Sequence, residues 1–531
     1  MSGEITAISA LNDQALKTYP VSSSAEIVEA MAAARRAAAV WAKIDVKQRV
    51  KQLAQLESVI LAELDAVTEV IIVATGKVKT EVILGEIYPV LSLLRYYKNN
   101  AAKILAPCPV FTAPLAFPQA EAGYERRPYG VVAVVSPWNF PFQLTLSPLL
   151  TALISGNACI FKMSELSLPV GELLMQLLSK LDLPQGLVQQ VTGFAETGEQ
   201  LIDARPDLVF FTGGVTAGRA VMARAAQHPV PVILELGGKD AMIVFADANL
   251  ERAAKAAMYG AFSNSGQVCV AIERCYVEAG CYAEFVDMLK DAAANVAVGH
   301  GAVGDLGGLT TLKQFAVIEA HYNDALAKGA KASSPLRLEG RYLHPVVLWD
   351  VTHDMRIMRE ETFGPLLPVM AFGSEQQAVD LANDSDYGLN ASVWSKDISK
   401  AERVAGQLQV GNWAVNDVIK NIGHPGLPFG GVKNSGFGRY HGAEGLRHFT
   451  YTVAGLTSRS PLNDEPNWFP YSDVRYLQMR GFIDFVFGSG GLYQRIAGNW
   501  RQLQAFRGYA SLNLRQHWHN LSILIFKRSI G

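Results

Sequence analysis

The N-terminal part of the chain has the spacing of amphipathic helices. Apolar residues recur at intervals of three and four at Ile27, Ala30, Met31, Ala34 and Ala38. This spacing places their side chains on one face of a helix. Similar spacing continues further along, so we predict a helical region over residues 25–105.

From residue 130 the pattern changes to short apolar runs that alternate with helical stretches. Runs of this length, bounded by turn residues, are typical of buried strands. The predicted strands cover residues 131–135, 158–161, 188–191, 208–211 and 232–236, and the predicted helices lie near 143–153, 169–181, 197–203 and 216–227. This repeated β-α order predicts a parallel sheet with helices on both faces.

A second alternation follows the first. It consists of an apolar run at 241–245, a helix from Leu250, a run at 274–277 and a helix from Tyr282. A chain of 531 residues is also too long for a single core. We therefore predict an α/β fold with two lobes in tandem.

Two segments fit neither lobe. Residues 106–128 suggest an extended excursion because they contain Pro107, Pro109, Pro114 and Pro118. The chain after residue 458 is basic and aromatic, and from Arg475 to its end it holds eight Lys or Arg residues against one acid, Asp484. Its apolar residues concentrate at 481–487, around Trp500 and Trp518, and at 521–526 before Lys527 and Arg528.

Composition narrows the class of protein. Half of the residues are apolar, 18% are charged and the net charge is −2, so no global charge favours nucleic acid. The first residues lack a signal-peptide pattern, and no apolar stretch is long enough to span a bilayer. The five cysteines show no metal-ligand spacing, which predicts no metal site and reduced thiols in a cytoplasmic protein. Four of them are expected to be inert, namely Cys108, Cys159, Cys275 and Cys281.

Residues with chemical potential follow the predicted strands of the first sheet. Asn139 follows the run at 131–135, Lys162 and Glu165 follow 158–161, Gly213, Gly214 and Gly218 follow 208–211, and Glu235 lies near the end of 232–236. Ligands of open parallel sheets bind at the carboxyl ends of the strands. The sequence therefore predicts a ligand site at that edge.

The strongest chemical signal is Cys269 together with Glu235. Cys269 ends the peptide NSGQVC, where a sulfur nucleophile has small neighbours. A thiol and a carboxylate at the end of an apolar strand suggest acyl chemistry through a thioester. An ion pair of Glu235 with Lys239 is the structural alternative.

The glycines and the pair Lys162 and Glu165 suggest a nucleotide. Gly213, Gly214 and Gly218 open a predicted helix, where bare N–H groups can bind a pyrophosphate, but their spacing fits a plain turn equally well. Lys162 and Glu165 fit either the ribose of an adenosine or a solvated surface pair. A carboxylate at Glu165 would repel a 2′-phosphate, which favours NAD over NADP.

With these motifs in place, the chain resembles the aldehyde dehydrogenase superfamily over about residues 20–457. The resemblance rests on PWNFP at 137–141, ELGGK at 235–239, GQVC at 266–269, ETFGP at 361–365 and PFGGVKNSG at 428–436. It implies a Rossmann-type cofactor-binding domain, an α/β catalytic domain and a small β-hairpin oligomerisation element. The expected boundaries are 1–105 with 129–237, then 238–445, then 106–128 with 446–457, and last a C-terminal extension at 458–531.

The resemblance also implies catalytic roles. Cys269 is expected to attack the aldehyde carbonyl, and the Asn139 amide with the backbone N–H of Cys269 to hold the oxyanion. Glu235 is expected to activate the water that hydrolyses the thioester.

Further roles concern the cofactor, for which NAD is expected and NADP stays open. Glu361 is expected to bond the nicotinamide-side ribose, Phe363 to pack near that ring, and Trp138 to pack beside the site. The family often has Ser or Thr where this chain has Gly214 and Val215, so backbone atoms must meet the phosphate there.

Three functions compete. The first is a hydrolytic aldehyde dehydrogenase that prefers NAD. The second is a CoA-acylating aldehyde dehydrogenase, whose members generally lack a carboxylate at the position of Glu235. The third is a non-catalytic homologue, against which Cys269, Asn139 and Glu235 all argue.

Substrate and partners are less constrained. Val268, Val270 and Ala271 flank the thiol, and no arginine is evident for the carboxylate of a semialdehyde, so an apolar or long-chain aldehyde is favoured. Basic amphipathic segments bind anionic membrane surfaces, so the tail fits a peripheral membrane contact; it equally fits a helical extension over a neighbouring subunit. By resemblance the chain forms a homodimer or a homotetramer.

Overall fold

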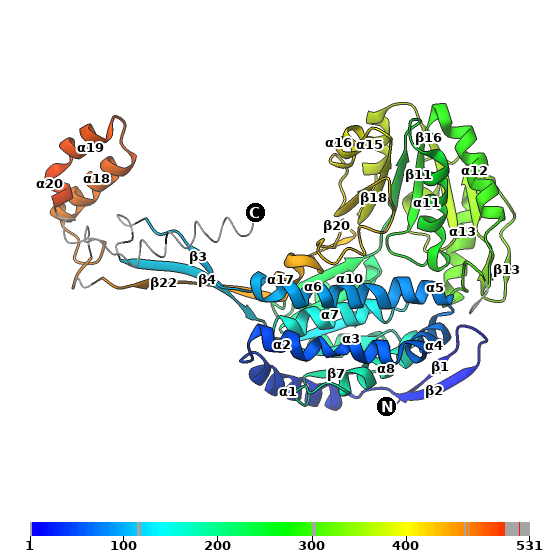
Figure 1. Ribbon diagram of the computed structural model, residues 1–531, viewed down its shortest axis with the longest axis horizontal. Helices are drawn as coiled ribbons and strands as arrows, with labels where there is room; N and C mark the ends of the chain where they lie inside the picture. The colour runs from blue at the N-terminus through cyan, green and yellow to red at the C-terminus, as the bar shows by residue number, and fades with distance from the viewer. Residues whose placement is uncertain are drawn as a thin grey trace. The chain divides into compact units, whose positions relative to one another are not determined.

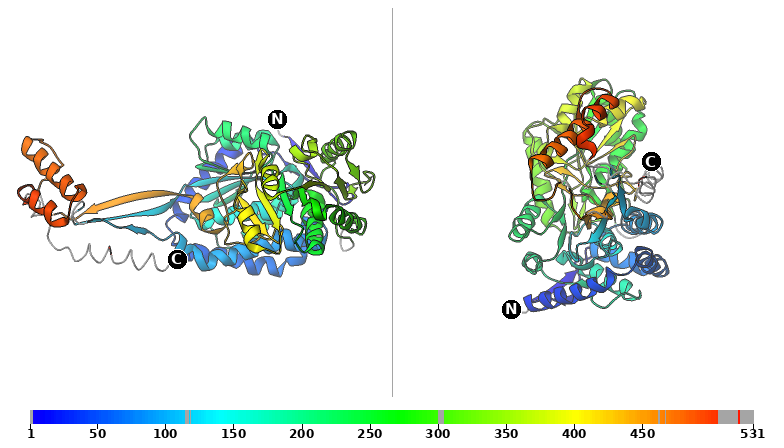
Figure 2. Two further views of the ribbon diagram at one scale, coloured as in Figure 1. Left: turned by 90° about the horizontal axis from the view of Figure 1, so that it is seen from above. Right: turned by 90° about the vertical axis from the view of Figure 1, so that its left-hand side faces the viewer.

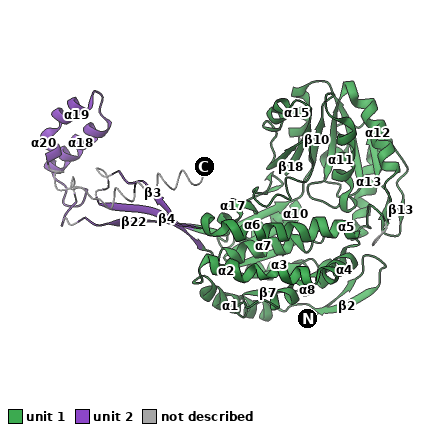
Figure 3. Ribbon diagram, in the orientation of Figure 1, with its two compact units in different colours: residues 1–105, 128–451 green, residues 106–127, 452–531 purple. Residues whose placement is uncertain are grey.

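The computed structural model describes residues 3–113, 117, 119–299, 304–460, 463–465, 467–504 and 520. The chain divides into two compact units (Figure 3): unit 1 holds residues 1–105 and 128–451, and unit 2 holds residues 106–127 and 452–531. The parts of the predicted tail around Trp518 and at 521–526 lie outside the described residues.

Unit 1 begins with an antiparallel hairpin that the sequence pattern did not predict, β1 (Glu4–Ile8) and β2 (Ala15–Pro20). The predicted helical region follows and is confirmed (Figure 1). It contains α1 (Ser24–Trp41), α2 (Val46–Leu53), α3 (Gln55–Ala62), α4 (Leu64–Thr75), α5 (Lys79–Glu81), a π-helical segment (Val82–Ile87) and α6 (Tyr88–Ile104). Helix α1 buries Ile27, Met31, Ala34 and Ala38, four of the five positions that the periodicity placed on one face, and Ala30 is partly buried.

The first sheet has the order β21-β9-β8-β5-β6-β7. All five predicted strands are present and parallel: β5 (Val131–Ser136), β6 (Ala158–Met163), β7 (Val188–Gln190), β8 (Leu208–Gly213) and β9 (Val232–Leu236). The helices between them are α7 (Gln143–Ile154), α8 (Leu168–Ser179), α9 (Ala195–Asp203) and α10 (Val215–Ala225). The short β21 (Gly436–Phe437) adds antiparallel to β9 at the edge and was not predicted.

The second sheet has the order β12-β15-β16-β11-β10-β18-β19. Its strands are β10 (Asp240–Val244), β11 (Ile272–Glu278), β12 (Lys331–Ala332), β15 (Val346–Trp349), β16 (Leu366–Phe372), β18 (Asn390–Trp394) and β19 (Asn412–Val415). All pairs are parallel except β12 with β15. The predicted second α/β alternation is therefore confirmed.

Helices cover both sheets (Figures 1 and 2). In the first sheet α7 packs against β5 and β6, α1 against β6, and α10 against β8 and β9. The helices that accompany the second sheet are α11 (Leu250–Phe262), α12 (Tyr282–Ala294), α13 (Lys313–Ala327), α14 (Arg356–Arg359), α15 (Glu375–Asn383) and α16 (Ile398–Ala405). Helix α17 (Gly442–His448) packs against α6 and α7 of the first lobe. Two small strand pairs complete unit 1, β13 (Leu338–Glu339) with β14 (Tyr342–Leu343) and β17 (Tyr387–Gly388) with β20 (Val432–Lys433).

The parallel strands form because their side chains are buried on both faces. Val131, Val132, Ala133 and Val134 of β5 are fully buried, as are all residues of β6. Continuous apolar runs of this kind are characteristic of parallel sheets covered by helices. The carboxyl ends of these strands meet at one edge, where the loops that follow them can hold a site.

Unit 2 consists of a three-stranded sheet and a helical tail. The sheet has the order β22-β4-β3, with β3 (Cys108–Val110), β4 (Ala120–Pro128) and β22 (Thr450–Ser458). The helices are α18 (Asp473–Phe487), α19 (Leu492–Gly498) and α20 (Trp500–Leu503). No helix in the described part of the chain is both long and apolar enough to cross a bilayer.

Candidate active site

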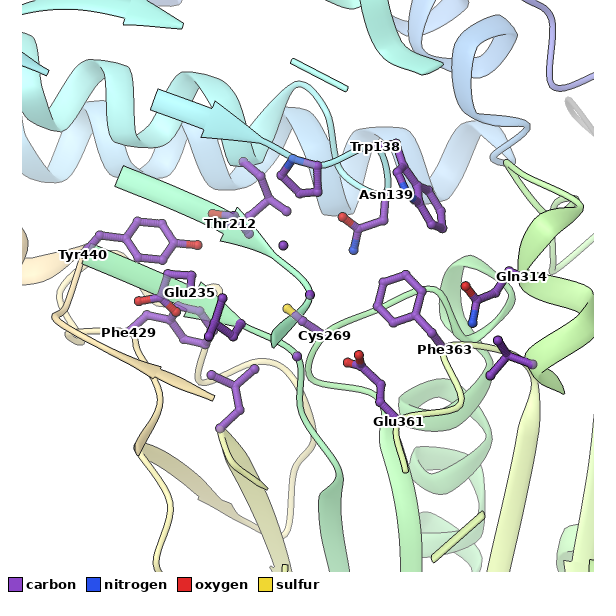
Figure 4. Close-up of a pocket in the computed structure, with 18 residues that line it drawn as sticks. Trp138, Asn139, Thr212, Glu235, Cys269, Gln314, Glu361, Phe363, Phe429 and Tyr440 are labelled. Atoms are coloured by element: carbon purple, nitrogen blue, oxygen red, sulfur yellow. The ribbon is translucent and has the colours of Figure 1, made fainter. Parts of the chain in front are cut away.

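A cavity of about 300 Å³ lies in unit 1 at the carboxyl edge of the first sheet (Figure 4). Most of the predicted site residues line it: Cys269, Glu235, Asn139, Trp138, Gly213, Gly214, Glu361 and Phe363. Loops from distant parts of the sequence therefore bring these residues together. Lys162, Glu165 and Gly218 are not among the lining residues.

Glu235 lies on β9 and is only 3% exposed. Neither of its carboxylate oxygens has a hydrogen-bond partner among the described residues. Burial raises the pKa of the Glu235 carboxyl well above its usual range, and the charge of Arg439 opposes this only in part. A buried carboxylate without a partner is costly in free energy, and such groups concentrate at functional sites.

The alternative ion pair between Glu235 and Lys239 does not form. The Lys239 ammonium instead pairs with Glu273 Oε2 at 2.5 Å and donates to Thr362 Oγ1 at 3.1 Å. All of these groups are buried. Glu235 is therefore left as an unpaired carboxylate at the cavity.

Cys269 follows a left-handed turn in the loop before β11. Asn264, Ser265 and Gly266 have φ values of 52°, 53° and 73°, a region that residues other than glycine rarely adopt. Burial raises the pKa of the Cys269 thiol, and the negative charges of Asp240, Glu361 and Glu235 raise it further. The thiol must therefore give its proton to a base before it can act as a nucleophile.

Asn139 follows β5 and is 3% exposed. Its side-chain Nδ2 donates to the carbonyl oxygen of Gln267 at 3.1 Å. Because an amide nitrogen carries two N–H groups, one donor remains for another acceptor. Figure 4 shows this amide pointing into the cavity on the side of the Cys269 sulfur.

Glu361 and Phe363 reach the cavity from the loop before β16. Glu361 Oε1 accepts the backbone N–H of Gly238 at 3.0 Å. Burial, together with the charge of Glu273, raises the pKa of Glu361 to about 8. Phe363 has a positive φ of 52°, and its ring packs edge-on against Trp138 with the centroids 5.6 Å apart. The two rings form an aromatic wall of the cavity.

The strained backbone at Phe363 is held by Glu273. The carboxylate of Glu273 accepts the N–H of Thr362 at 2.7 Å and that of Phe363 at 2.9 Å. The same carboxylate binds Lys239, so one buried ion pair fixes the loop that carries Glu361. Strained residues of this kind persist where the surrounding contacts determine them.

Gly213 and Gly214 lie where β8 ends and α10 begins. Gly214 is the residue before the first turn of α10, and a Cβ there would meet no atom within 4 Å. The first N–H groups of a helix lack partners within the helix and attract anions. The residues present therefore fit the phosphate of a dinucleotide at this edge.

The remaining predicted cofactor residues lie away from the cavity lining. Lys162 is not in a solvated surface pair: it is 5% exposed and donates to the carbonyl oxygen of Met163 at 3.0 Å, and burial lowers its pKa. Glu165 begins a short 3-10 turn and accepts the Ser164 hydroxyl at 3.4 Å. A Cβ at Gly218 would lie 2.5 Å from Leu236, so this glycine lets α10 pack closely on β9. Cofactor contacts of Lys162, Glu165 and Gly218 stay predictions.

The sequence interpretation missed several lining residues. These are Pro137, Leu144, Thr212, Leu236, Gly237, Gln314, Val317, Leu389, Phe429 and Tyr440. Phe429 belongs to the PFGG peptide at 428–431, so that motif offered a signal. Tyr440 offered none, yet its ring packs edge-on against Phe210 and Phe429 and lies on the Glu235 side of the cavity in Figure 4. No Lys or Arg is among the described lining residues.

A thiol, a carboxylate and a carboxamide that share one cavity at the edge of a parallel sheet are typical of enzymes that attack a carbonyl through sulfur. Comparison with known families agrees, since the aldehyde dehydrogenase family model matches residues 1–454. The chain belongs to the aldehyde dehydrogenase family and is an oxidoreductase that acts on aldehydes. The predicted family and the α/β fold class are confirmed.

Relatives and solved structures extend the comparison. The chain is 59% identical over 520 residues to a 4,4'-diapolycopene aldehyde oxidase from a Methylomonas species, with 98% of each chain covered. It is 32% identical to a betaine aldehyde dehydrogenase from Bacillus subtilis, over 87% of this chain and 95% of that one. Among solved structures, a betaine aldehyde dehydrogenase from Staphylococcus aureus in complex with NAD+ matches with a TM-score of 0.82 and 29% identity, covering 88% of this chain and 94% of that one.

The turn before Cys269 allows a prediction about stability. A Cβ at Gly266 would lie 2.3 Å from the backbone of Gly364, and φ is positive there. We expect Gly266→Ala to lower the free energy of unfolding by about 2–4 kcal/mol, because overpacking adds to backbone strain. Gly329→Ala is the matched control, since φ is +96° but no atom lies within 4 Å. Equal denaturant midpoints for the two variants would contradict the close approach at Gly266.

Proposed function

We propose that this protein oxidises a long, apolar aldehyde to the carboxylic acid through a thioester on Cys269, with NAD as the hydride acceptor. The observation that carries the proposal is the unpartnered, buried carboxylate of Glu235 in the cavity that also holds the Cys269 thiol and the Asn139 amide. A carboxylate in that state is available as a base.

In the first step, the Cys269 thiol loses its proton to solvent and the sulfur attacks the carbonyl carbon. The carbonyl oxygen gains negative charge as the C–S bond forms. The second N–H of the Asn139 amide and the backbone N–H of Cys269 donate to this oxygen. A donor of this kind typically lowers the barrier by about 3–4 kcal/mol.

The dinucleotide would lie along the edge where Gly213, Gly214, Glu361 and Phe363 line the cavity. The start of α10 offers N–H groups to its phosphates, and Glu361 offers a carboxylate to a ribose. When bound, the cofactor accepts the hydride that the tetrahedral adduct releases, which leaves a thioester on Cys269. Glu165 after β6 supports NAD rather than NADP, because its charge would repel a 2′-phosphate.

In the last step, Glu235 removes a proton from water, and the hydroxide attacks the thioester. The C–S bond breaks, the carboxylic acid leaves, and the proton held by Glu235 passes to the Cys269 sulfur. The presence of this base supports hydrolysis over transfer to CoA, since a thiol acceptor needs no activated water.

The lining of the cavity supports an apolar substrate. Leu144, Leu389, Phe429 and Tyr440 contribute apolar or aromatic surface, and the charged lining residues are the acids Glu235 and Glu361. A substrate with a carboxylate at its far end would meet no compensating cation among the described lining residues. The Methylomonas relative, which is named for an aldehyde of the long, apolar carotenoid diapolycopene, also supports this substrate class.

Glu235→Gln tests the catalytic proposal. We expect kcat to fall by about 10²–10⁴-fold, because the base is lost, and an acyl adduct on Cys269 to accumulate in intact-protein mass spectrometry. Since burial raises the pKa of Glu235, wild-type kcat should fall as the pH drops through a value above the usual carboxyl range. The variant should lose this acidic limb. Cys269→Ala is the control without adduct, and wild-type turnover by Glu235→Gln across the pH range would overturn the proposal.

An aldehyde panel tests the substrate and the acceptor. We expect kcat/KM to rise by up to about fourfold for each added methylene until the cavity is filled, because each buried methylene contributes about 0.8 kcal/mol. Succinate semialdehyde should be a poor substrate, and NADH should form without oxygen or CoA. A requirement for CoA would favour the acylating alternative, and turnover that needs oxygen instead of NAD would favour an oxidase.

Unit 2 supports a peripheral membrane contact. Its tail exposes Phe469 (79%), Phe487 (76%) and Tyr493 (84%) near and on α18 and α19. Together with the excess of basic residues after Arg475, this is the composition of segments that bind anionic bilayer surfaces. The Methylomonas relative aligns over 98% of the chain and so shares most of the tail, whereas the Bacillus relative aligns over 87%.

Vesicle flotation tests this contact. We expect the full chain to float with vesicles that contain phosphatidylglycerol, and less in high salt or with neutral lipid, because the basic residues need an anionic surface. Replacement of Phe469, Phe487 and Tyr493 by Ser should abolish flotation and leave turnover of a short, water-soluble aldehyde unchanged. Replacement of the exposed Val28, Val40 and Leu61 of unit 1 by Ser is the matched control. If this triple variant floated like the wild type but eluted as a smaller particle in size-exclusion chromatography, the three residues would form a subunit contact instead.

The sheet of unit 2 supports association into a homodimer or a homotetramer. Strand β22 lies at the edge of the order β22-β4-β3, and most of its residues are exposed. An edge strand presents unpaired N–H and C=O groups that pair readily with another chain. This is the element that the resemblance assigned to oligomerisation.

A further inference from the structure

Three ionisable side chains near the cavity have no part in the proposed chemistry: Lys77, Glu81 and Glu86. They lie on one short segment in which α5 runs directly into the π-helical segment Val82–Ile87. Such π turns are rare and occur frequently at functional sites.

Lys77 and Glu86 hold the loop that carries Asn139. Both side chains are fully buried, and the Lys77 Nζ lies 3.1 Å from Glu86 Oε1. The same ammonium donates to the backbone carbonyl of Asn139 and lies 4.4 Å from the centroid of the Phe140 ring. Glu86 Oε2 accepts the N–H groups of Phe142 at 3.1 Å and of Gln143 at 2.9 Å. The loop is therefore fixed at Asn139 and directly after it.

Glu81 holds the loop that carries the nucleophile. Its Oε1 accepts the backbone N–H of Asn264 at 2.5 Å. Asn264 begins the left-handed turn before Cys269, with a φ of 52°. A residue other than glycine is strained in this region, so external contacts must maintain it.

Asn264 also links the two loops directly. Its Nδ2 donates to the carbonyl of Asn139 at 3.2 Å and to that of Gln267 at 3.1 Å. The carbonyl of Gln267 also accepts the Asn139 amide. The carbonyl of Asn139 thus receives donors from both Lys77 and Asn264, and the position of its side-chain amide depends on both.

We propose that Lys77, Glu81 and Glu86, together with the Asn264 side chain that links the two loops, form a loop clamp, which sets the Asn139 amide and the Cys269 loop at the mutual position that oxyanion binding requires. The clamp residues touch neither substrate nor cofactor and act as positioning residues. The inference rests on the proposed function, in which the Asn139 amide binds the oxyanion. A misplacement of about 1 Å in such a site can lower the rate about 100-fold.

A double-mutant cycle between Lys77→Met and Asn139→Ala tests the clamp. We expect Lys77→Met alone to lower kcat about 10- to 100-fold with little change in KM, because the amide is displaced. In the Asn139→Ala background the same substitution should lower kcat less than threefold, since the group it positions is gone. Additive losses would overturn the clamp. Full wild-type kcat in Lys77→Met would overturn it too.

Lys77→Met leaves Glu86 buried without its partner and is expected to lower stability as well. A second variant is therefore needed to separate an effect on positioning from an effect on folding. Asn264→Gly removes the Nδ2 donors, and glycine accepts the positive φ without strain. We expect kcat to fall at least 10-fold with no loss in the thermal midpoint, and an unchanged kcat would contradict the clamp. Lys98→Met, on the exposed side of α6, is the control. If Asn139→Ala itself kept wild-type kcat, the oxyanion role in the proposed function would fail, which is distinguishable from failure of the clamp alone.

Discussion

The central constraint on the site is that ionisable side chains are buried around the Cys269 thiol. Glu235 is buried without a hydrogen-bond partner among the described residues, and burial raises the pKa of both Glu235 and Cys269. Phe429 and Tyr440, which line the same cavity, pack edge-on against each other. The fold therefore has to let Glu235 and Cys269 lose their protons in surroundings that disfavour the charged forms. A site with that cost persists only where the rest of the unit is stable enough to carry it.

Two buried ion pairs serve this purpose in similar ways. Lys239 with Glu273 fixes the loop of Glu361 and Phe363, and Lys77 with Glu86 contacts the loop of Asn139. In each pair the carboxylate also accepts two backbone N–H groups of a loop that lines the cavity. Buried pairs add little net stability, because desolvation offsets their attraction. Their main effect is on conformation: they make one backbone conformation of the neighbouring loop lower in free energy than the others.

The sequence predicted most of the fold because the parallel strands are continuous apolar runs, as in β5, and that signal depends only on burial. Hairpin β1-β2 and strand β21 were missed, since both are short and lie at edges where few side chains are buried. Cys269 and Glu235 were predicted as a pair. The sequence did not show that Glu235 has no partner, because this depends on Lys239 forming its ion pair with Glu273. Lys77 and Glu86 offered no signal, because charged residues in a helical stretch usually face solvent.

Lipophilic substrates pose a problem that a pocket alone does not solve. Each buried methylene gains about 0.8 kcal/mol whether it enters a bilayer or an apolar protein cavity. Transfer from lipid to this cavity therefore gains little, and a long aldehyde stays in the membrane unless the enzyme is close to it. Unit 1 has the form it shares with relatives named for betaine aldehyde, which is small and charged. The tail beyond residue 458 is where this chain and the Methylomonas relative extend further. The proposed membrane contact of the tail would place the enzyme beside such a substrate, a task that the shape of the cavity alone does not perform.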